Sequence, residues 1–593
     1  MMDPRRVAAA QIISRRRARL ATRSVRSWLR ASEASFIVLA IGVGGLAGLL
    51  SVIQGALART LQHLIFALPS NTRLSGAADL GLASLIVLPM GGLIFAAFGY
   101  VTRARKRRLV DAVEANALHG GRMSLADSLV ISGQTILSNG FGASVGLEAA
   151  YAQMGGAVAS VLGGWMKLRR ADQRTLVGAG TGAAIAAAFG DPLAGAFYAF
   201  EVVIGAYTPS AIAPVAAAAL AGGLVAQTFG QQPYLIDAAS NVSVETHHFL
   251  IYAGLGALCA VLGIALMRAV ALVEHATRRT GIPDWMRPAL GGVLLIPIAM
   301  VSPQALSAGH SALHTDLALG ASLSFILLVL FAKSLASVVS LGFGFRGGLF
   351  FASLFLGTLI GHLFAAGLTS LIGYPVVDTR NAELVGMAAF AVSVIGGPMT
   401  MAMLVLQATH DFPLTGAVIA ASLVSTTIVR EVFGYSFSTW RLHLRGETIK
   451  SARDVGWVKT LTAGRMMRKE ARPTPAAISI TEFRRAFPLG STSRVVLADA
   501  QYAYAGIVVV PAAYAEGLDP NAGVATLASG RDVVLTPEMD IAAVMASFDA
   551  AGTDELAVLS ADRHVLGIIS ETYVRRRYAE ELEKAQRELF GER

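Results

Sequence analysis

One carboxylate stands in a stretch of the chain that otherwise carries no charge. Glu148 lies among glycine, alanine and valine residues in "NGFGASVGLEAAYAQMGGAVAS" (139–160), and the nearest charged side chains along the chain are Asp127 and Lys167. A charge at the middle of a bilayer costs several kcal/mol, so an ionisable residue in such a segment is a functional candidate. The alternative is a carboxylate at a helix interface that has a local hydrogen-bond partner.

The segment around Glu148 belongs to a long apolar part of the chain. The 593 residues are 54% hydrophobic and 15% charged, with a mean hydropathy of +0.58, whereas a soluble domain carries about 25% charged residues. Several apolar stretches reach the ~20 residues that span a hydrocarbon core. They lie at 34–58, 79–100, 129–166, 176–205, 210–229, 248–275, 287–302, 317–343, 348–372, 384–408 and 413–434. The sequence predicts a polytopic membrane domain in a lipid bilayer, followed by a soluble region.

Arginines gather in an N-terminal arm, residues 1–32, and again at 102–108, 167–174 and 441–472. The positive-inside rule places these segments in the cytoplasm. We therefore expect an integral protein of a bacterial cytoplasmic membrane with both termini inside. The net charge of +10 is explained by topology and lipid contact, and nucleic-acid binding is not expected because no aromatic residues alternate with the arginines. The single cysteine, Cys259, is expected to be a buried apolar residue, and no metal site is predicted.

The apolar region contains two copies of one order of features, in which a Gly-rich turn opens an apolar helix and a Gly/Asp-Pro turn opens another. The copies are "VGLEAAYAQMGGAVAS" (145–160) with "FGDPLAGAFYAFEVV" (189–203), and "RGGLFFASLFLGTLIG" (346–361) with "IGGPMTMAMLVLQAT" (395–409). Pro192 and Pro398 occupy equivalent places, where a missing N–H costs nothing. Repeated halves with broken helices indicate a binding site between the repeats. Helix N-termini inside a membrane attract an anion, although small-residue motifs also serve close helix packing.

In these segments the chain resembles the CLC family of chloride channels and proton-coupled chloride transporters. "VGLEAAYAQMGG" is similar to the family's Gly-Arg-Glu-Gly-Pro segment and following Gly-Gly pair, and "RGGLFFASLFLGTLIG" to its Gly-x-Phe-x-Pro segment. The resemblance implies that Glu148 is the gating glutamate, whose carboxylate occupies the anion path and swings away. It also implies anion contacts along the backbone and a pore in each subunit of a homodimer. The implied pathway positions are Gly146, Leu147, Ala149, Gly348, Leu349, Phe350, Phe351, Phe437 and Tyr435.

The chain departs from the family pattern around the expected anion path. Leu147, Ala149 and Ala150 replace the Arg and Gly-Pro beside the glutamate, and Ala352 replaces the closing proline. The family's Gly-Ser-Gly-Ile-Pro segment is not recognisable, and its serine would fall near Arg108.

Two further positions bear on selectivity and on proton coupling. The register favours Phe437 for the family's anion-contacting tyrosine, with Tyr435 as the nearest hydroxyl. In proton-coupled members a second glutamate follows the position of Glu201, and this chain has Val202 there. Valine cannot carry a proton, so the resemblance implies weak or absent proton coupling. Glu201 is the alternative relay, although on a helix it points about 100° away from its neighbour.

The soluble region also repeats itself. "TPAAISITEFRRAF" (474–487) is echoed by "TPEMDIAAVMASF" (536–548), and each copy continues into two short β-branched runs around an Asp-containing turn. The region resembles a pair of CBS domains, some of which bind adenosine nucleotides. Ser570 matches the ligand-contacting hydroxyl, but Tyr573 stands where an aspartate is expected. We therefore favour a structural or dimer-stabilising module without a cofactor.

The predicted fold is an all-α membrane domain of two inverted repeats followed by a cytoplasmic α/β pair. The expected parts are the arm (1–32), the membrane domain (33–445, with halves of about 33–230 and 247–440), and the two modules (446–515 and 516–593, the second with a C-terminal helix). The expected function is a chloride channel or transporter with a glutamate gate. Alternatives are a proton/chloride antiporter, a fluoride- or nitrate-selective relative, an organic-solute transporter, an intramembrane enzyme and a non-conducting sensor.

Overall fold

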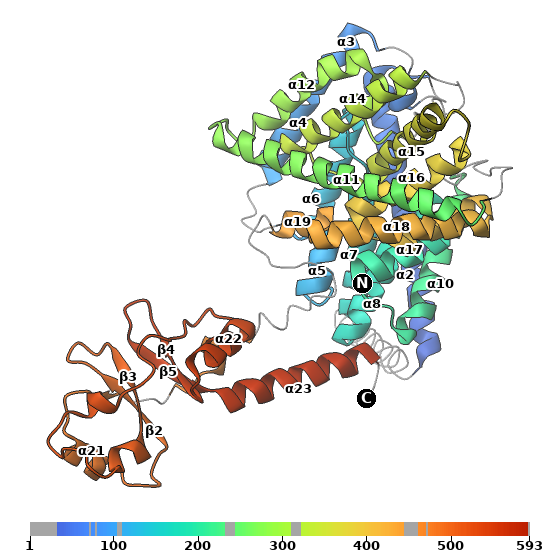
Figure 1. The fold of residues 1–593 in the computed structure, drawn as a ribbon. Coiled ribbons are helices and arrows are strands. Elements are labelled where there is room, and N and C mark those ends of the chain that lie inside the picture. The colour runs from blue at the N-terminus through green and yellow to red at the C-terminus, as the bar shows by residue number, and fades with distance from the viewer. Residues whose placement is uncertain are drawn as a thin grey trace, which may run out of the picture. The chain divides into compact units, whose positions relative to one another are not determined.

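The computed structural model describes residues 32–69, 73–77, 80–102, 109–231, 244–309, 322–443, 461–469 and 473–590 (Figure 1). The chain forms two compact units, Met1–Asp454 and Val455–Arg593. The boundary expected at 445/446 and the basic arm fall outside the described residues.

The first half of the larger unit consists of helices. They are α2 (Glu33–Phe66), η1 (Leu74–Gly76), α3 (Leu82–Leu85), α4 (Val87–Thr102), α5 (Ala112–Leu118), α6 (Leu125–Gly140), α7 (Glu148–Met166), α8 (Arg170–Phe189), α9 (Pro192–Tyr198) with its π-helical continuation η2 (Ala199–Ile204), and α10 (Pro209–Thr228).

The second half runs through a matching series. It comprises α11 (His248–Arg279), α12 (Arg287–Val301), η3 (Pro303–Ala305), α14 (Leu323–Gly342), α15 (Phe350–Ile372), α16 (Thr379–Ile395), α17 (Pro398–Thr409), α18 (Phe412–Val432) and α19 (Phe437–His443). Among the described residues, α2, α10, α11, α14, α15 and α18 are long and apolar enough to cross a membrane. Figure 1 shows α11 and α18 side by side, as α2 and α10 are in the first half.

The two halves are the predicted inverted repeats. Their long opening helices have 34 and 32 residues, and their closing helices have 20 and 21. Contacts between the halves are reciprocal, because Gly92 on α4 lies against Pro288 of α12 while Gly292 on α12 lies against Leu88 of α4. An approximate two-fold axis between the repeats explains this exchange of equivalent contacts.

Glycine pairs let helix backbones touch at equivalent places in the two repeats. A Cβ atom on Gly155 of α7 would lie 2.3 Å from the carbonyl oxygen of Gly180 on α8, and one on Gly357 of α15 would lie 2.5 Å from that of Gly386 on α16. Helix association in membranes relies on such close packing of small residues. The Gly-Gly pair after Glu148 therefore serves helix packing rather than the cavity described below.

The smaller unit contains the two predicted α/β modules. The first has β1 (Thr474–Pro475), α21 (Ile480–Ala486), β2 (Arg494–Ala498), β3 (Tyr504–Val509), η5 (Val510–Tyr514) and η6 (Val524–Leu527), and the second has α22 (Ile541–Ala551), β4 (Glu555–Leu559), β5 (Val565–Ser570) and α23 (Glu571–Phe590). In the first sheet β1 pairs with β2 in parallel and β2 with β3 antiparallel, and β4 pairs with β5 antiparallel.

Two features join the modules: a short helix that precedes the first module but packs into the second, and an apolar interface. The short helix α20 (Ala463–Met466) precedes the first module in the chain but packs into the core of the second. A cluster that includes Val496 and Ile507 of the first sheet and Ala557 of the second connects the modules. The described residues thus form a pair, as the internal repeat predicted.

The close contact between α15 and α16 yields a stability prediction. Gly357→Val should lower the free energy of unfolding of the protein in detergent by about 1–3 kcal/mol, because the added atoms overlap the α16 backbone. Gly367→Val is the matched control, since Gly367 lies on the same helix and has open space at its Cβ position. Thermal unfolding followed by near-UV circular dichroism would compare the two variants. Equal losses of stability in both would contradict the role of the close contact between α15 and α16.

Candidate functional site

The N-termini of α7 and α15 meet where the two repeats touch. The Gly146 N–H donates to the Gly348 carbonyl at 2.9 Å, and the Gly348 N–H donates to the Gly146 carbonyl at 3.3 Å. The same turn is held by the Ser340 hydroxyl, which accepts from the Ser144 N–H at 2.9 Å. Because helices leave their first N–H groups unpaired, these two ends bring positive potential to one place.

The carboxylate of Glu148 lies over the start of α15. Its side chain is only 5% exposed, and its Oε1 accepts a hydrogen bond from the Phe350 N–H. Its Oε2 has no hydrogen-bond partner among the described residues. The carboxylate therefore reaches a helix N-terminus 202 positions away in the chain.

Two glycines make room for this carboxylate. A Cβ atom on Gly146 would lie 1.8 Å from Oε2 of Glu148, and one on Gly348 would lie 2.5 Å from Oε1. Any larger residue at either position would displace the carboxylate. The glycines that pair the two turns thus also shape the space in which the acid lies.

Lys333 on α14 supplies a positive charge that the sequence around Glu148 does not show. Its side chain has 0% exposure, and its Nζ donates to the carbonyl oxygens of Ala305 at 3.2 Å and Ser307 at 2.6 Å. The ammonium and the Glu148 carboxylate attract each other electrostatically. Because Lys333 is fully buried, its ammonium does not extend to the membrane surface as many lysines at helix ends do.

A cavity of about 130 Å³ adjoins the Glu148 carboxylate. The predicted pathway residues that line it are Glu148, Ala149, Gly348, Leu349, Phe350 and Phe437. Gly146 and Leu147 are buried beside it without being among its described lining residues, and Phe351 stacks on Phe189 with ring centroids 4.4 Å apart. Of the two candidates on α19 and the turn before it, the structure places Phe437 on the cavity. Tyr435 instead packs against Phe433 and Trp440.

Sequence reasoning missed several polar residues on this cavity, among them Tyr198 and Asp111. The buried Tyr198 on α9 contacts the Phe350 ring, with centroids 5.9 Å apart. Asp111 caps α5, since its carboxylate accepts from the Glu114 N–H at 2.8 Å. An aspartate three residues before a glutamate is an N-cap signal that could have located it. Arg108, the expected position of the missing serine, lies outside the described residues.

Glu201, the alternative proton relay, acts as a cap for a helix of the other repeat. Its carboxylate accepts from the N–H groups of Met399 at 3.0 Å and Thr400 at 2.8 Å, and from the Thr400 hydroxyl at 2.7 Å. The exchange is again reciprocal, because Gln407 of α17 accepts from the Leu193 N–H at the start of α9 at 3.1 Å. Val202 is buried.

These features define a membrane protein in which two helix N-termini meet a buried carboxylate at the interface of two inverted repeats. Residues 92–430, more than half of the chain, match the family model described as voltage gated chloride channel. The chain therefore belongs to the CLC family of chloride channels and transporters. This membership excludes the alternative of an intramembrane enzyme.

Two relatives illustrate the similarity in sequence. A "putative chloride channel protein ClcB-like" of Ralstonia nicotianae is 28% identical over 308 residues, which cover 51% of this chain and 71% of the relative. The "voltage-gated ClC-type chloride channel ClcB" of Escherichia coli is 26% identical over 356 residues, which cover 59% of this chain and 84% of the relative.

Solved structures share the fold. A slow cyanobacterial Cl−/H+ antiporter matches with a TM-score of 0.60 and 21% identity, over 69% of this chain and 97% of its own. A CLC-type fluoride/proton antiporter matches with a TM-score of 0.57 and 20% identity, over 67% and 96%. A eukaryotic CLC transporter matches with a TM-score of 0.60 and 18% identity, over 90% and 97%. At 90% coverage the last match extends beyond the membrane unit into the smaller one.

The candidate nucleotide residues lie in the second module of the smaller unit. Ser570 ends β5, and Tyr573 follows on α23, where the guanidinium of Arg576 lies 5.6 Å from its ring centroid. The aromatic ring of Tyr573 therefore stands at the sequence position where the nucleotide-binding pattern of CBS domains has an aspartate for the ribose.

The hydrogen bonds from the start of α17 to Glu201 predict that this side chain contributes to the stability of the protein. Glu201→Ala should lower the free energy of unfolding by about 1–3 kcal/mol, because two N–H groups at the start of α17 lose their acceptor. Glu201→Gln, which keeps one acceptor oxygen, should lose less. Glu431→Ala, which changes an exposed residue on α18, is the control. Thermal unfolding in detergent is the measurement, and a Glu201→Ala protein as stable as the control would contradict the capping role.

Proposed function

We propose that this protein conducts chloride through the cavity at the start of α15, with the Glu148 carboxylate as the gate. The observation that carries the proposal is that Glu148 takes the Phe350 N–H at a helix N-terminus. An anion passing this point needs the same donor, because broken-helix N-termini are the groups in a membrane that favour negative charge.

The gate works by competition between two negative groups. The ionised carboxylate binds the Phe350 N–H and closes the path. Protonation removes the charge that the helix N-terminus stabilises, so the neutral acid leaves more readily and an anion takes its place. Gly146 and Gly348 have no side chain to hinder this exchange, and the cavity beside Glu148 gives the anion somewhere to lie.

The second part of the proposal is that transport is weakly or not coupled to protons. The position that relays protons in coupled members is the buried Val202. The neighbouring Glu201 is held as a cap on α17 by three hydrogen bonds. The name of the Escherichia coli relative, a chloride channel, agrees with this reading. Two of the structural neighbours are proton antiporters, so coupling has to be measured directly.

The remaining proposals concern assembly and location. Following the family, we propose a homodimer with one pore in each subunit, in a bacterial cytoplasmic membrane with both termini in the cytoplasm. The paired modules of the C-terminal unit serve this assembly without a nucleotide, because Tyr573 replaces the expected aspartate.

The gate predicts a specific effect of Glu148→Ala. Wild-type protein in liposomes should release chloride faster as the pH falls, and the variant should conduct at least as fast at neutral pH as the wild type does at low pH. Chloride efflux, followed with a halide electrode, would test this. Glu431→Ala is the control. A Glu148→Ala variant with the flux and pH dependence of the wild type would contradict the gate.

Proton movement recorded in the same assay tests coupling. A chloride gradient should drive no stoichiometric proton uptake. Proton pumping by the wild type would contradict uncoupled transport and would show that a group other than Val202 carries protons. Absence of flux for chloride, fluoride and nitrate would favour a non-conducting sensor.

A further inference from the structure

The outer face of α11 carries a charged residue in an apolar stripe. Val261, Ala265, Arg268 and Leu272 are exposed and follow one another at intervals of three or four residues, so they share one face of the helix. Leu272 is 70% exposed and Val261 is 59% exposed. Because α11 is long and apolar enough to cross a membrane, an exposed apolar stripe on it meets lipid. Arg268 therefore lies on a surface that lipid contacts.

Contacts at two levels show that α11 and α18 run side by side in the same direction (Figure 1). A Cβ atom on Gly256 of α11 would lie 2.2 Å from the carbonyl oxygen of Ala421 on α18. Further along both helices, the guanidinium carbon of Arg268 lies 5.8 Å from the ring centroid of Phe433, the residue that follows α18. Positions can therefore be compared along the two helices from their starts.

The lengths of the two helices place an arginine of each at the edge of the hydrocarbon core. From His248, where α11 begins, to Arg268 the helix rises ~30 Å. From Phe412, where α18 begins, to Arg430 it rises ~27 Å. Since the hydrocarbon core of a bilayer is ~30 Å thick, both arginines lie at the level of the lipid headgroups.

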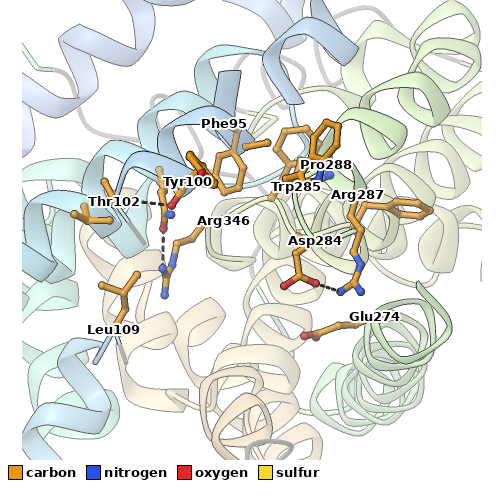
Figure 2. Close-up of a pocket in the computed structure, with 18 of the residues that line it drawn as sticks. Phe95, Tyr100, Thr102, Leu109, Glu274, Asp284, Trp285, Arg287, Pro288 and Arg346 are labelled. Atoms are coloured by element: carbon orange, nitrogen blue, oxygen red, sulfur yellow. Dashed lines mark hydrogen bonds and ion pairs between the residues drawn. The ribbon is translucent and has the colours of Figure 1, made fainter. Parts of the chain in front are cut away.

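A charged cavity on the inner side of α11 agrees with this level. It has a volume of about 590 Å³ and lies among the ends of α4, α6, α11, α12 and α14 (Figure 2). Its lining includes Glu274 of α11 and the Asp284–Arg287 pair, in which the two side chains are 2.9 Å apart. Charged side chains within a membrane protein face water or one another. Glu274 is less than two helical turns beyond Arg268, so the aqueous boundary lies close to Arg268.

Aromatic residues surround Arg268 at the same level. Phe433, which lies under its guanidinium, contacts Tyr435 and Trp440 with ring centroids 6.3 Å and 4.7 Å apart. Tyrosine and tryptophan are enriched where a membrane meets water. The cluster is a second indication, independent of helix length, that Arg268 lies at the interface.

The charges of Arg268 and Arg430 differ from those of the large cavity in their partners. In the cavity Arg278 pairs with Glu274 at 2.6 Å. Arg268 and Arg430 are both exposed, and within the described part of the chain neither forms an ion pair. Glu431 follows Arg430 in the chain, but successive helix residues point about 100° apart. This surface therefore presents two positive charges toward the headgroups.

We propose that Arg268 and Arg430 bind the phosphate of an anionic phospholipid, whose acyl chains lie along the exposed stripe at Val261 and Ala265. The phosphate supplies the negative charge that the surface lacks. A guanidinium is weakly hydrated and offers a planar fork of N–H donors, which matches the oxygens of a phosphate. The ring of Phe433 supports the guanidinium of Arg268 through a cation–π contact and so holds it in place for the lipid.

Charge favours a lipid over a second copy of the chain as the occupant. At a two-fold interface the same surface meets itself, so two copies would bring these positive charges together at a cost. Arg278 and Arg279 in the last turn of α11 mark this end as cytoplasmic in the orientation proposed above. Anionic lipids attract arginines at such a surface.

The test is lipid binding to the full-length protein in maltoside micelles, counted by native mass spectrometry. Phosphatidylglycerol should bind more tightly than phosphatidylcholine with the same acyl chains. Arg268→Gln and Arg430→Gln should each weaken phosphatidylglycerol binding about fivefold, the contribution of one arginine at a membrane surface, and leave phosphatidylcholine binding unchanged. Arg268→Lys keeps the charge and should retain most of the affinity.

Arg279→Gln is the matched control, because it removes an exposed arginine from the last turn of the same helix. It should leave the affinity for phosphatidylglycerol unchanged. Inorganic phosphate at the concentration of the lipid should not displace bound phosphatidylglycerol, since it lacks the acyl chains that the apolar stripe contacts.

Four results would overturn the lipid surface. The first is an unchanged affinity for phosphatidylglycerol in both glutamine variants, in protein that unfolds at the temperature of the wild type. The second is an equal loss in Arg279→Gln, which would make the attraction a general one. The third is displacement of the lipid by inorganic phosphate, and the fourth is a smaller share of dimer in the glutamine variants with full lipid binding, which would show that a second copy covers this face. Ion flux does not enter the assay, so absence of conduction would defeat the proposed function alone.

Discussion

The membrane unit depends on the meeting of two helix N-termini in its interior. α7 and α15 begin where the repeats touch, and the backbone bridge between Gly146 and Gly348 holds their opening turns together. Unpaired N–H groups at such a depth are costly unless something accepts their hydrogen bonds. Glu148 does this for α15, and the two glycines leave space for its carboxylate. Glu148, the lone charged residue of an apolar segment, thus accepts a hydrogen bond from a backbone N–H at the start of α15.

The same solution recurs at two other broken helices. Glu201 satisfies the start of α17 and Gln407 satisfies the start of α9, each from the opposite repeat. Glu148 differs from these caps because it alone of the three lines one of the two cavities described here. A cap that borders a cavity can exchange with an ion from that cavity, whereas Glu201 and Gln407 line neither cavity. This difference distinguishes Glu148, the proposed gate, from the structural caps Glu201 and Gln407.

Much of this arrangement could be predicted from local patterns. Glycine and proline spacing located the starts of α7, α9, α15 and α17, and the order of these signals indicated two repeats. The contacts between distant segments could not be read in this way. Lys333 attracts Glu148 although 185 positions separate them, and the acceptor role of Glu201 depends on how α17 packs. Which of Phe437 and Tyr435 borders the cavity depends on the path of the turn before α19. The capping role of Asp111 depends on where α5 begins, which the basic run before it does not indicate.

The central claim is that an anion and the Glu148 carboxylate compete for the Phe350 N–H. Anomalous diffraction from crystals grown in bromide tests it most directly, with wild type and Glu148→Gln compared at neutral pH. The account predicts a bromide peak at hydrogen-bond distance from the Phe350 nitrogen in the variant, with the glutamine side chain displaced, and no peak there in the wild type. The claim would be contradicted if the glutamine side chain still accepted a hydrogen bond from the Phe350 N–H and no bromide peak lay beside the Phe350 nitrogen.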